Sequence, residues 1–117
     1  MKKFSMIVVF VFCMTGLAFA DSYTMATSSG EKTEDTQIMT GLGALTAVQL
    51  ITDGTNAATV VCYDGTSGSG KKIGEYKVDG AVYYRGWAWI WPVSIETGIW
   101  CDVTGTGASF IVEYIQR

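Results

Sequence analysis

The chain has 117 residues, of which 49% are hydrophobic, 8 are Lys or Arg, 11 are Asp or Glu and none is His. An acidic chain with scattered positive charge lacks the basic face that nucleic-acid binding requires, so we expect no nucleic-acid partner. The absence of histidine removes the usual general base and the usual zinc ligand, which weighs against an enzyme.

The first 20 residues predict a cleavable secretory signal peptide. Lys2 and Lys3 precede an apolar run over residues 4–17, and an Ala-Phe-Ala motif follows at 18–20, which is the usual order of such a signal. The alternative is a transmembrane anchor, but the apolar run is shorter than the roughly 20 residues that a spanning helix needs. We therefore expect an exported protein, in the periplasm, at the cell surface or outside the cell, with no membrane span in the mature chain.

Residues 21–36, DSYTMATSSGEKTEDT, are polar and show neither a two-residue nor a helical period. A segment of this kind buries too little apolar surface to offset its ordering entropy. The pattern predicts a flexible leader that connects the cleavage site to the folded domain.

Residues 37–117 predict one all-β domain, because Val, Ile, Thr, Tyr and Trp dominate and Gly-containing turns interrupt them. Short strands at this spacing are typical of a single antiparallel β-sandwich or jelly-roll-like domain of about seven strands. The expected strands cover residues 37–40, 45–52, 59–64, 72–78, 81–91, 99–103 and 109–115.

Four turns are predicted from residues that tolerate positive φ. The Asp79-Gly80 pair indicates a two-residue hairpin, and Pro92, the only proline, is expected to end the strand before it. The predicted turns are Asp53-Gly54, Asp64-Gly65, Asp79-Gly80 and Gly105-Thr106-Gly107.

Signal cleavage would leave two cysteines, Cys62 and Cys101. An even pair in a small exported domain favours a disulfide over two buried thiols. Closing a loop of about 40 residues would stabilise the fold by about 4 kcal/mol in the chain-entropy model. Cys101 shares its predicted strand face with Ile99 and Val103, so we expect it to be buried.

Candidate catalytic and ligand-binding motifs are weak. Residues 65–72, GTSGSGKK, approach a phosphate-binding loop but lack the Ser or Thr after the lysine, and a strand is expected where the loop needs a helix. The Asp53-Gly54-Thr55-Asn56 turn lacks a third carboxylate for calcium. The remaining aspartates, Asp64, Asp79 and Asp102, lie at turns or strand ends, so we expect no catalytic residue, metal site or cofactor.

The segment 81–91, AVYYRGWAWIW, is the most informative one. Strand alternation places a ladder of four aromatic residues and one cation on one face. Facing outward, this ladder would be a subunit interface or a platform for sugar rings. Facing inward, it would be core, and a bulge at Gly86 would switch the faces halfway. The ladder consists of Tyr83, Arg85, Trp87, Trp89 and Trp91.

Two segments, ATVVCYDGTSGSGKKIGEYKV at 58–78 and PVSIETGIWCDVTGTGASFIVEY at 92–114, resemble the small β-sandwich structural proteins of tailed bacteriophages. The resemblance implies a non-enzymatic virion component that decorates or joins larger assemblies. This chain differs from typical members of that group in having a secretion signal, the cysteine pair and the Trp-rich strand. The sequence therefore predicts an exported, phage-like structural or interaction module that binds proteins or itself, and the alternative is a carbohydrate-binding module that stacks polysaccharide on the aromatic ladder.

Overall fold

The computed structural model describes residues 25–117. The predicted signal peptide, residues 1–20, lies outside this range. The described residues form eight strands and no helix. The strands are β1 (Thr27–Ser28), β2 (Thr36–Thr40), β3 (Gly43–Ile51), β4 (Ala58–Asp64), β5 (Lys71–Val78), β6 (Tyr84–Ile95), β7 (Gly98–Thr104) and β8 (Ser109–Gln116).

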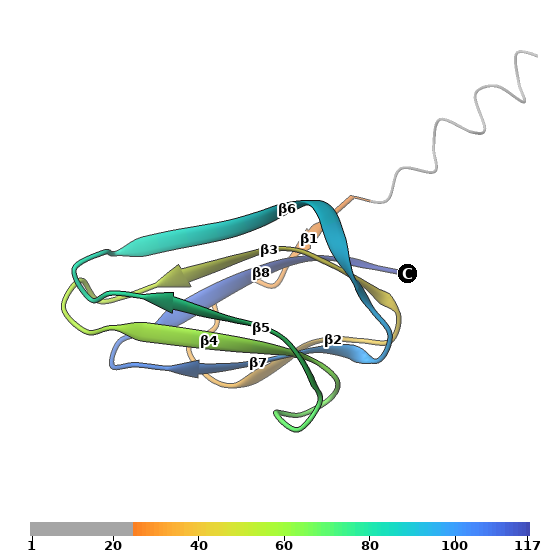
Figure 1. Ribbon diagram of the computed structural model, residues 1–117, viewed down its shortest axis with the longest axis horizontal. Coiled ribbons are helices and arrows are strands. Elements are labelled where there is room, and N and C mark those ends of the chain that lie inside the picture. The colour runs from red at the N-terminus through yellow and green to blue at the C-terminus, as the bar shows by residue number, and fades with distance from the viewer. Residues whose placement is uncertain (1–24) are drawn as a thin grey trace, which may run out of the picture.

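The strands form two antiparallel four-stranded sheets that pack face to face (Figure 1). One sheet has the order β1-β8-β3-β6 and the other the order β2-β7-β4-β5. The first strand therefore pairs with the last, the second with the seventh, and so on inward to the β4–β5 hairpin. A long antiparallel hairpin rolled up in this way is a jelly roll, which confirms the predicted all-β sandwich.

The core lies between the two sheets, where alternate residues of the inner strands meet. Val48 and Leu50 of β3 face the interior from one sheet, and Val60 of β4 does so from the other, each with no exposed surface. Phe110 of β8 is the largest fully buried side chain. Burying side chains of this size contributes roughly 1.5–3 kcal/mol each before the entropy cost, so this alternation holds the two layers together.

The predicted disulfide is present and links β4 to β7. Cys62 and Cys101 are direct cross-strand partners within one sheet, their Cα atoms are 4.2 Å apart, and neither side chain is exposed. Ile99 is buried on the same face as Cys101, as its strand alternation predicted. The bridge therefore fixes the middle of a sheet from within the core, and it fits an oxidising environment.

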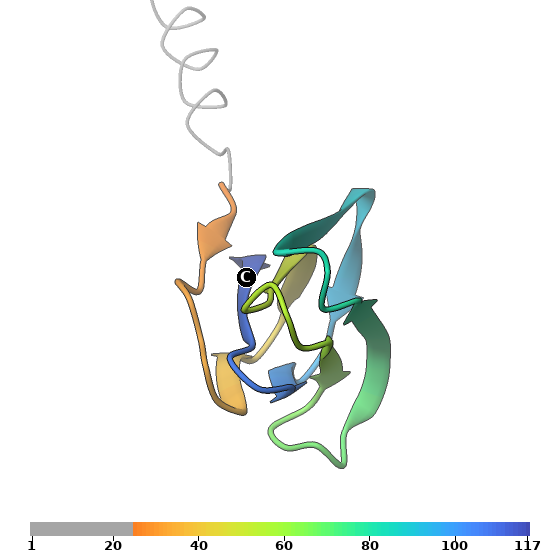
Figure 2. The ribbon, with the colours of Figure 1, turned by 90° about the vertical axis from the view of Figure 1, so that its left-hand side faces the viewer.

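The predicted leader needs correction from Thr27 onward. Thr27 and Ser28 form β1 on the edge of β8, and Lys32 exchanges backbone hydrogen bonds of 2.8 and 2.9 Å with Phe110. The chain then crosses to the other sheet, where β2 begins at Thr36, as Figure 2 shows on one side of the sandwich. Backbone hydrogen bonding, for which a polar sequence gives no signal, makes this stretch part of the fold.

The Asp79-Gly80 hairpin prediction is wrong. β5 and β6 belong to different sheets, so residues 79–83 cross between the layers. Gly80 has no positive φ; a side chain there would collide with the carbonyl oxygen of Thr55. Close backbone approach therefore explains this glycine, whereas the predicted positive φ is found at Gly54, Gly105 and Gly107 and not at Gly65.

Candidate binding surface along strand β6

Strand β6 forms one edge of its sheet, where it pairs with β3 and lies over β5, the edge strand of the other sheet. We call the side of the sandwich that β5 and β6 bound the open side, and the side that β1 and β2 bound the closed side. No further strand within residues 25–117 covers the outer edge of β6.

A large bulge interrupts β6. Between the pairs Ala47↔Ala88 and Leu45↔Val93, β6 advances five positions while β3 advances two. The extra residues loop out of the ladder at the place where Pro92 cannot donate a backbone hydrogen bond. The prediction that Pro92 ends the strand is therefore wrong. The bulge contains Pro92, and pairing with β3 resumes after it as far as Gly43↔Ile95.

Trp87, before the bulge, and Trp89, at its start, turn inward and are half-buried against the core. Their rings lie 5.1 and 5.8 Å from the ring of Tyr76 on β5, centroid to centroid. Burial raises the pKa of the Tyr76 hydroxyl, and the guanidinium carbon of Arg85 lies 5.7 Å from the centre of the Trp87 ring. This aromatic cluster joins the edges of the two sheets and closes the core on the open side.

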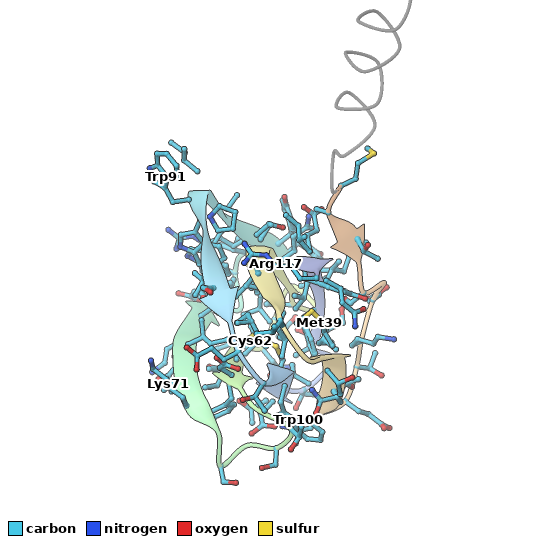
Figure 3. All side chains as sticks on the ribbon, turned by 90° about the vertical axis from the view of Figure 1, so that its right-hand side faces the viewer. Met39, Cys62, Lys71, Trp91, Trp100 and Arg117 are labelled. Carbon is cyan, nitrogen blue, oxygen red and sulfur yellow. A yellow bond between two sulfur atoms is a disulfide. The ribbon has the colours of Figure 1, made fainter. Side chains whose placement is uncertain are left out.

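Ile90 and Trp91 have the opposite environment. Their side chains are 93% and 87% exposed, and Figure 3 shows Trp91 projecting from the bend of β6 away from the sheets. We call this pair the β6 tip. Two adjacent large apolar side chains with almost no cover are unusual in a soluble domain.

The structure therefore divides the predicted aromatic ladder. Trp87 and Trp89 follow the inward alternative and Trp91 the outward one, and the switch lies after Ala88 rather than at Gly86. Tyr83 precedes β6 and is 70% exposed, with its ring over Gly54. The five residues do not form one continuous platform.

A second feature, which the sequence did not reveal, lies on the outer face of the β6 sheet. A shallow groove of about 300 Å³ forms there, and we call it the outer groove. Cross-strand register explains it: Glu113, Ala47 and Ala88 form one row across three strands, and Gln49 and Gly86 belong to the next. The small residues Ala47, Gly86 and Ala88 leave the hollow, and Tyr84, Gln49 and Glu113 border it.

The turn aspartates serve the fold. Asp64 accepts backbone hydrogen bonds of 3.0, 2.9 and 3.2 Å from Glu96, Thr97 and Gly98. Partial burial would raise the pKa of Asp64, but these three amides and nearby Lys71 together hold it below its ordinary value. Asp64 thus fixes the link from β6 to β7.

Asp53 closes its own turn. Its carboxylate accepts hydrogen bonds from the Thr55 and Asn56 amides at 2.8 and 2.7 Å. These bonds lower the pKa of Asp53, and the bond from Asn56 contributes most. Within residues 25–117, no three His, Cys, Asp or Glu side chains gather where they could hold a metal ion. The same residues include no helix long and apolar enough to span a membrane.

Comparisons with known proteins add no relationship. No protein-family model matches the chain, and no curated protein and no solved structure matches it significantly. The resemblance to phage structural proteins has no support from these comparisons and stays a prediction.

Proposed function

We propose that this chain is a non-enzymatic, exported interaction module that binds another protein through the open side of its jelly roll. The observation that carries the proposal is the β6 tip, where Ile90 and Trp91 are 93% and 87% exposed on a looped-out bulge. Exposed Trp side chains are frequent anchors of protein interfaces, because they bury much apolar area at a low entropic cost.

Protection of the sheet edge does not account for the tip. A bulge with a proline prevents unwanted strand pairing, but it needs no large apolar side chains. The neighbouring edge strand β5 shows the usual means of protection, since Lys72 and Lys77 are exposed and both contact Glu75, at 2.7 and 3.1 Å. Ile90 and Trp91 expose apolar surface that such protection does not require.

The signal-like N-terminus and the buried disulfide support an extracytoplasmic site of action, in the periplasm, at the cell surface or outside the cell. The proposal rests on the tip and does not need the phage resemblance.

The outer groove favours carbohydrate binding as a second candidate function. Tyr84, 57% exposed, offers a ring against which a sugar could stack, and Gln49 and Glu113 offer polar atoms beside it. The site differs from the predicted platform, because Trp87 and Trp89 are turned toward Tyr76.

Site-specific photo-crosslinking tests the proposed function. A photoreactive phenylalanine analogue replaces Trp91 in the exporting cell, and a matched variant carries it at Thr66, an exposed position in the β4–β5 loop. We expect discrete protein adducts from position 91 and none from position 66. Equal labelling at both positions, or no adduct at position 91, would contradict a protein-binding tip.

A further inference from the structure

The β6 tip and the outer groove lie on the same strand, and neither has a partner within residues 25–117. The tip consists of Ile90 and Trp91, and the groove surrounds Gly86 and Ala88. The two features are adjacent along β6, because the groove lining ends at Ala88 and the tip begins at Ile90, where the bulge interrupts the ladder.

We propose that the partner is a second copy of this chain, with the β6 tip of each copy seated in the outer groove of the other. The inference rests on the proposed function and names the partner. A two-fold axis near Ala88 brings the two β6 edges together in antiparallel orientation. Each tip then meets the other copy's groove, and the assembly closes as a dimer because the interface is isologous.

The groove suits an indole ring in size and in chemistry. The groove is open to solvent and offers about 300 Å³, which admits an aromatic side chain. Gly86, Ala88 and Ala47 give a floor without bulky side chains. A ring on this floor lies close to the sheet backbone, with the stems of Gln49 and Glu113 at its border.

The groove also supplies what a buried tryptophan needs. The indole N–H requires an acceptor once water is removed. Glu113 and Gln49 form no side-chain hydrogen bond or ion pair with any other residue of the 25–117 range, so their oxygens are free to accept. Ile90, next to Trp91, covers the rim and removes its own side chain from water.

Charge along the edge permits the pairing. Between Tyr84 and Val93, Arg85 is the one charged residue of β6, and its side chain turns toward Trp87. The exported chain carries 6 Lys or Arg against 11 Asp or Glu once Lys2 and Lys3 are removed. Two such copies repel each other weakly at long range, so added salt should strengthen the dimer rather than dissociate it.

Sedimentation equilibrium of the exported protein tests the proposal with three variants. Trp91→Ala removes the main side chain of the tip. Gly86→Val fills the groove, and a Cβ at this position meets its first neighbour, the Tyr84 hydroxyl, at 3.4 Å, so the fold should accept it. Leu42→Ala removes another exposed apolar side chain, one that is 59% exposed and outside both features.

The wild type and Leu42→Ala should dimerise, whereas Trp91→Ala and Gly86→Val should each weaken the dimer at least tenfold. A mixture of Trp91→Ala and Gly86→Val should form a heterodimer of intermediate affinity, because one intact tip meets one intact groove. Circular dichroism and the unfolding midpoint confirm that each variant is folded.

Several results would overturn the inference. A wild type that stays monomeric at its highest soluble concentration overturns it, and a position-91 adduct to a different protein would then leave the proposed function in place. Glycan-array binding that Gly86→Val abolishes and Trp91→Ala preserves, in a monomeric protein, assigns the groove to a saccharide instead. Oligomers that grow without limit with concentration contradict the two-fold closure.

Discussion

The two lateral sides of this jelly roll are closed by different means. On the closed side, the segment between β1 and β2 supplies hydrogen bonds: Val112 donates its amide to the Ser29 hydroxyl at 2.9 Å, and Val103 donates to Asp35 at 2.8 Å. On the open side, Trp87, Trp89 and Tyr76 cover the core with side chains while the backbone edge of β6 stays free.

The difference separates stability from binding. On the closed side, the segment between β1 and β2 is bonded to β8 and β7, whereas the side closed by aromatic rings keeps the long free edge of β6 beside the β6 tip. Trp87 and Trp91 are four positions apart on one strand, yet the first serves the fold and the second is available to a partner.

The largest expected effect concerns the disulfide, which lies in the sheet between the two sides. Replacing both Cys62 and Cys101 with alanine opens a loop with a sequence separation of 39. We expect a loss of about 4 kcal/mol in the free energy of unfolding, measured by urea denaturation. Mass spectrometry should show no free thiol in the unreduced wild type. An unchanged denaturation midpoint would contradict a structural bridge.

The next effect compares two tryptophans of β6. Trp87→Ala removes a half-buried ring that contacts Tyr76, and we expect it to cost about 2–3 kcal/mol, less than for a fully buried ring. Trp91→Ala, measured on dilute protein, should change the free energy of unfolding by less than about 0.5 kcal/mol. Similar losses in both variants would refute the division between the two residues.

A smaller effect tests the hydrogen bonding of the closed side. Asp35→Ala removes the acceptor for the Val103 amide and should cost about 0.5–1 kcal/mol. Hydrogen exchange at Val103 should accelerate. Glu34→Ala is the control, because it removes the same charge from a neighbouring exposed side chain. If both variants exchange alike at Val103, this segment does not hold the side closed.

The last effect is of similar size, depends on pH and concerns the link between the two sheets at the end of β6. The folded state lowers the pKa of Asp64 below its ordinary value of 3.8, so ionised Asp64 stabilises the fold fully above that pH. The contribution disappears as the pH falls through the lower folded pKa. Asp64→Asn should lower the free energy of unfolding at neutral pH by up to about 1 kcal/mol and flatten its decline in acid. An equally steep acid decline in the variant would place the titrating group elsewhere.

Sequence patterns predicted much of the fold, because half-buried strands alternate and turns need particular residues. All seven predicted strands are present, and the cysteine pair forms the expected bridge. β1 was missed, since two residues in a polar run carry no alternation. Asp79-Gly80 was misread because a glycine needed for close packing looks the same in sequence as one needed for a hairpin.

The candidate surface was harder to predict. A proline such as Pro92 is compatible with the end of a strand and with a bulge inside one. Only the register with β3 distinguishes the two. The bulge separates Trp91 from Trp87, which simple alternation placed on one face. The outer groove depends on residues from three strands, so no single segment could reveal it.

The central claim is that Trp91, alone among the tryptophans of β6, is free in the single molecule and covered on binding. Fluorine NMR of the protein labelled with 5-fluorotryptophan tests it directly, with each signal assigned by a single Trp→Phe variant. In dilute protein, the Trp91 signal should show the largest shift between H₂O and D₂O. With rising concentration it should move and lose that sensitivity, while the Trp87 and Trp89 signals stay fixed. A Trp91 signal that is already shielded in dilute protein, or one that never changes with concentration, would contradict the account.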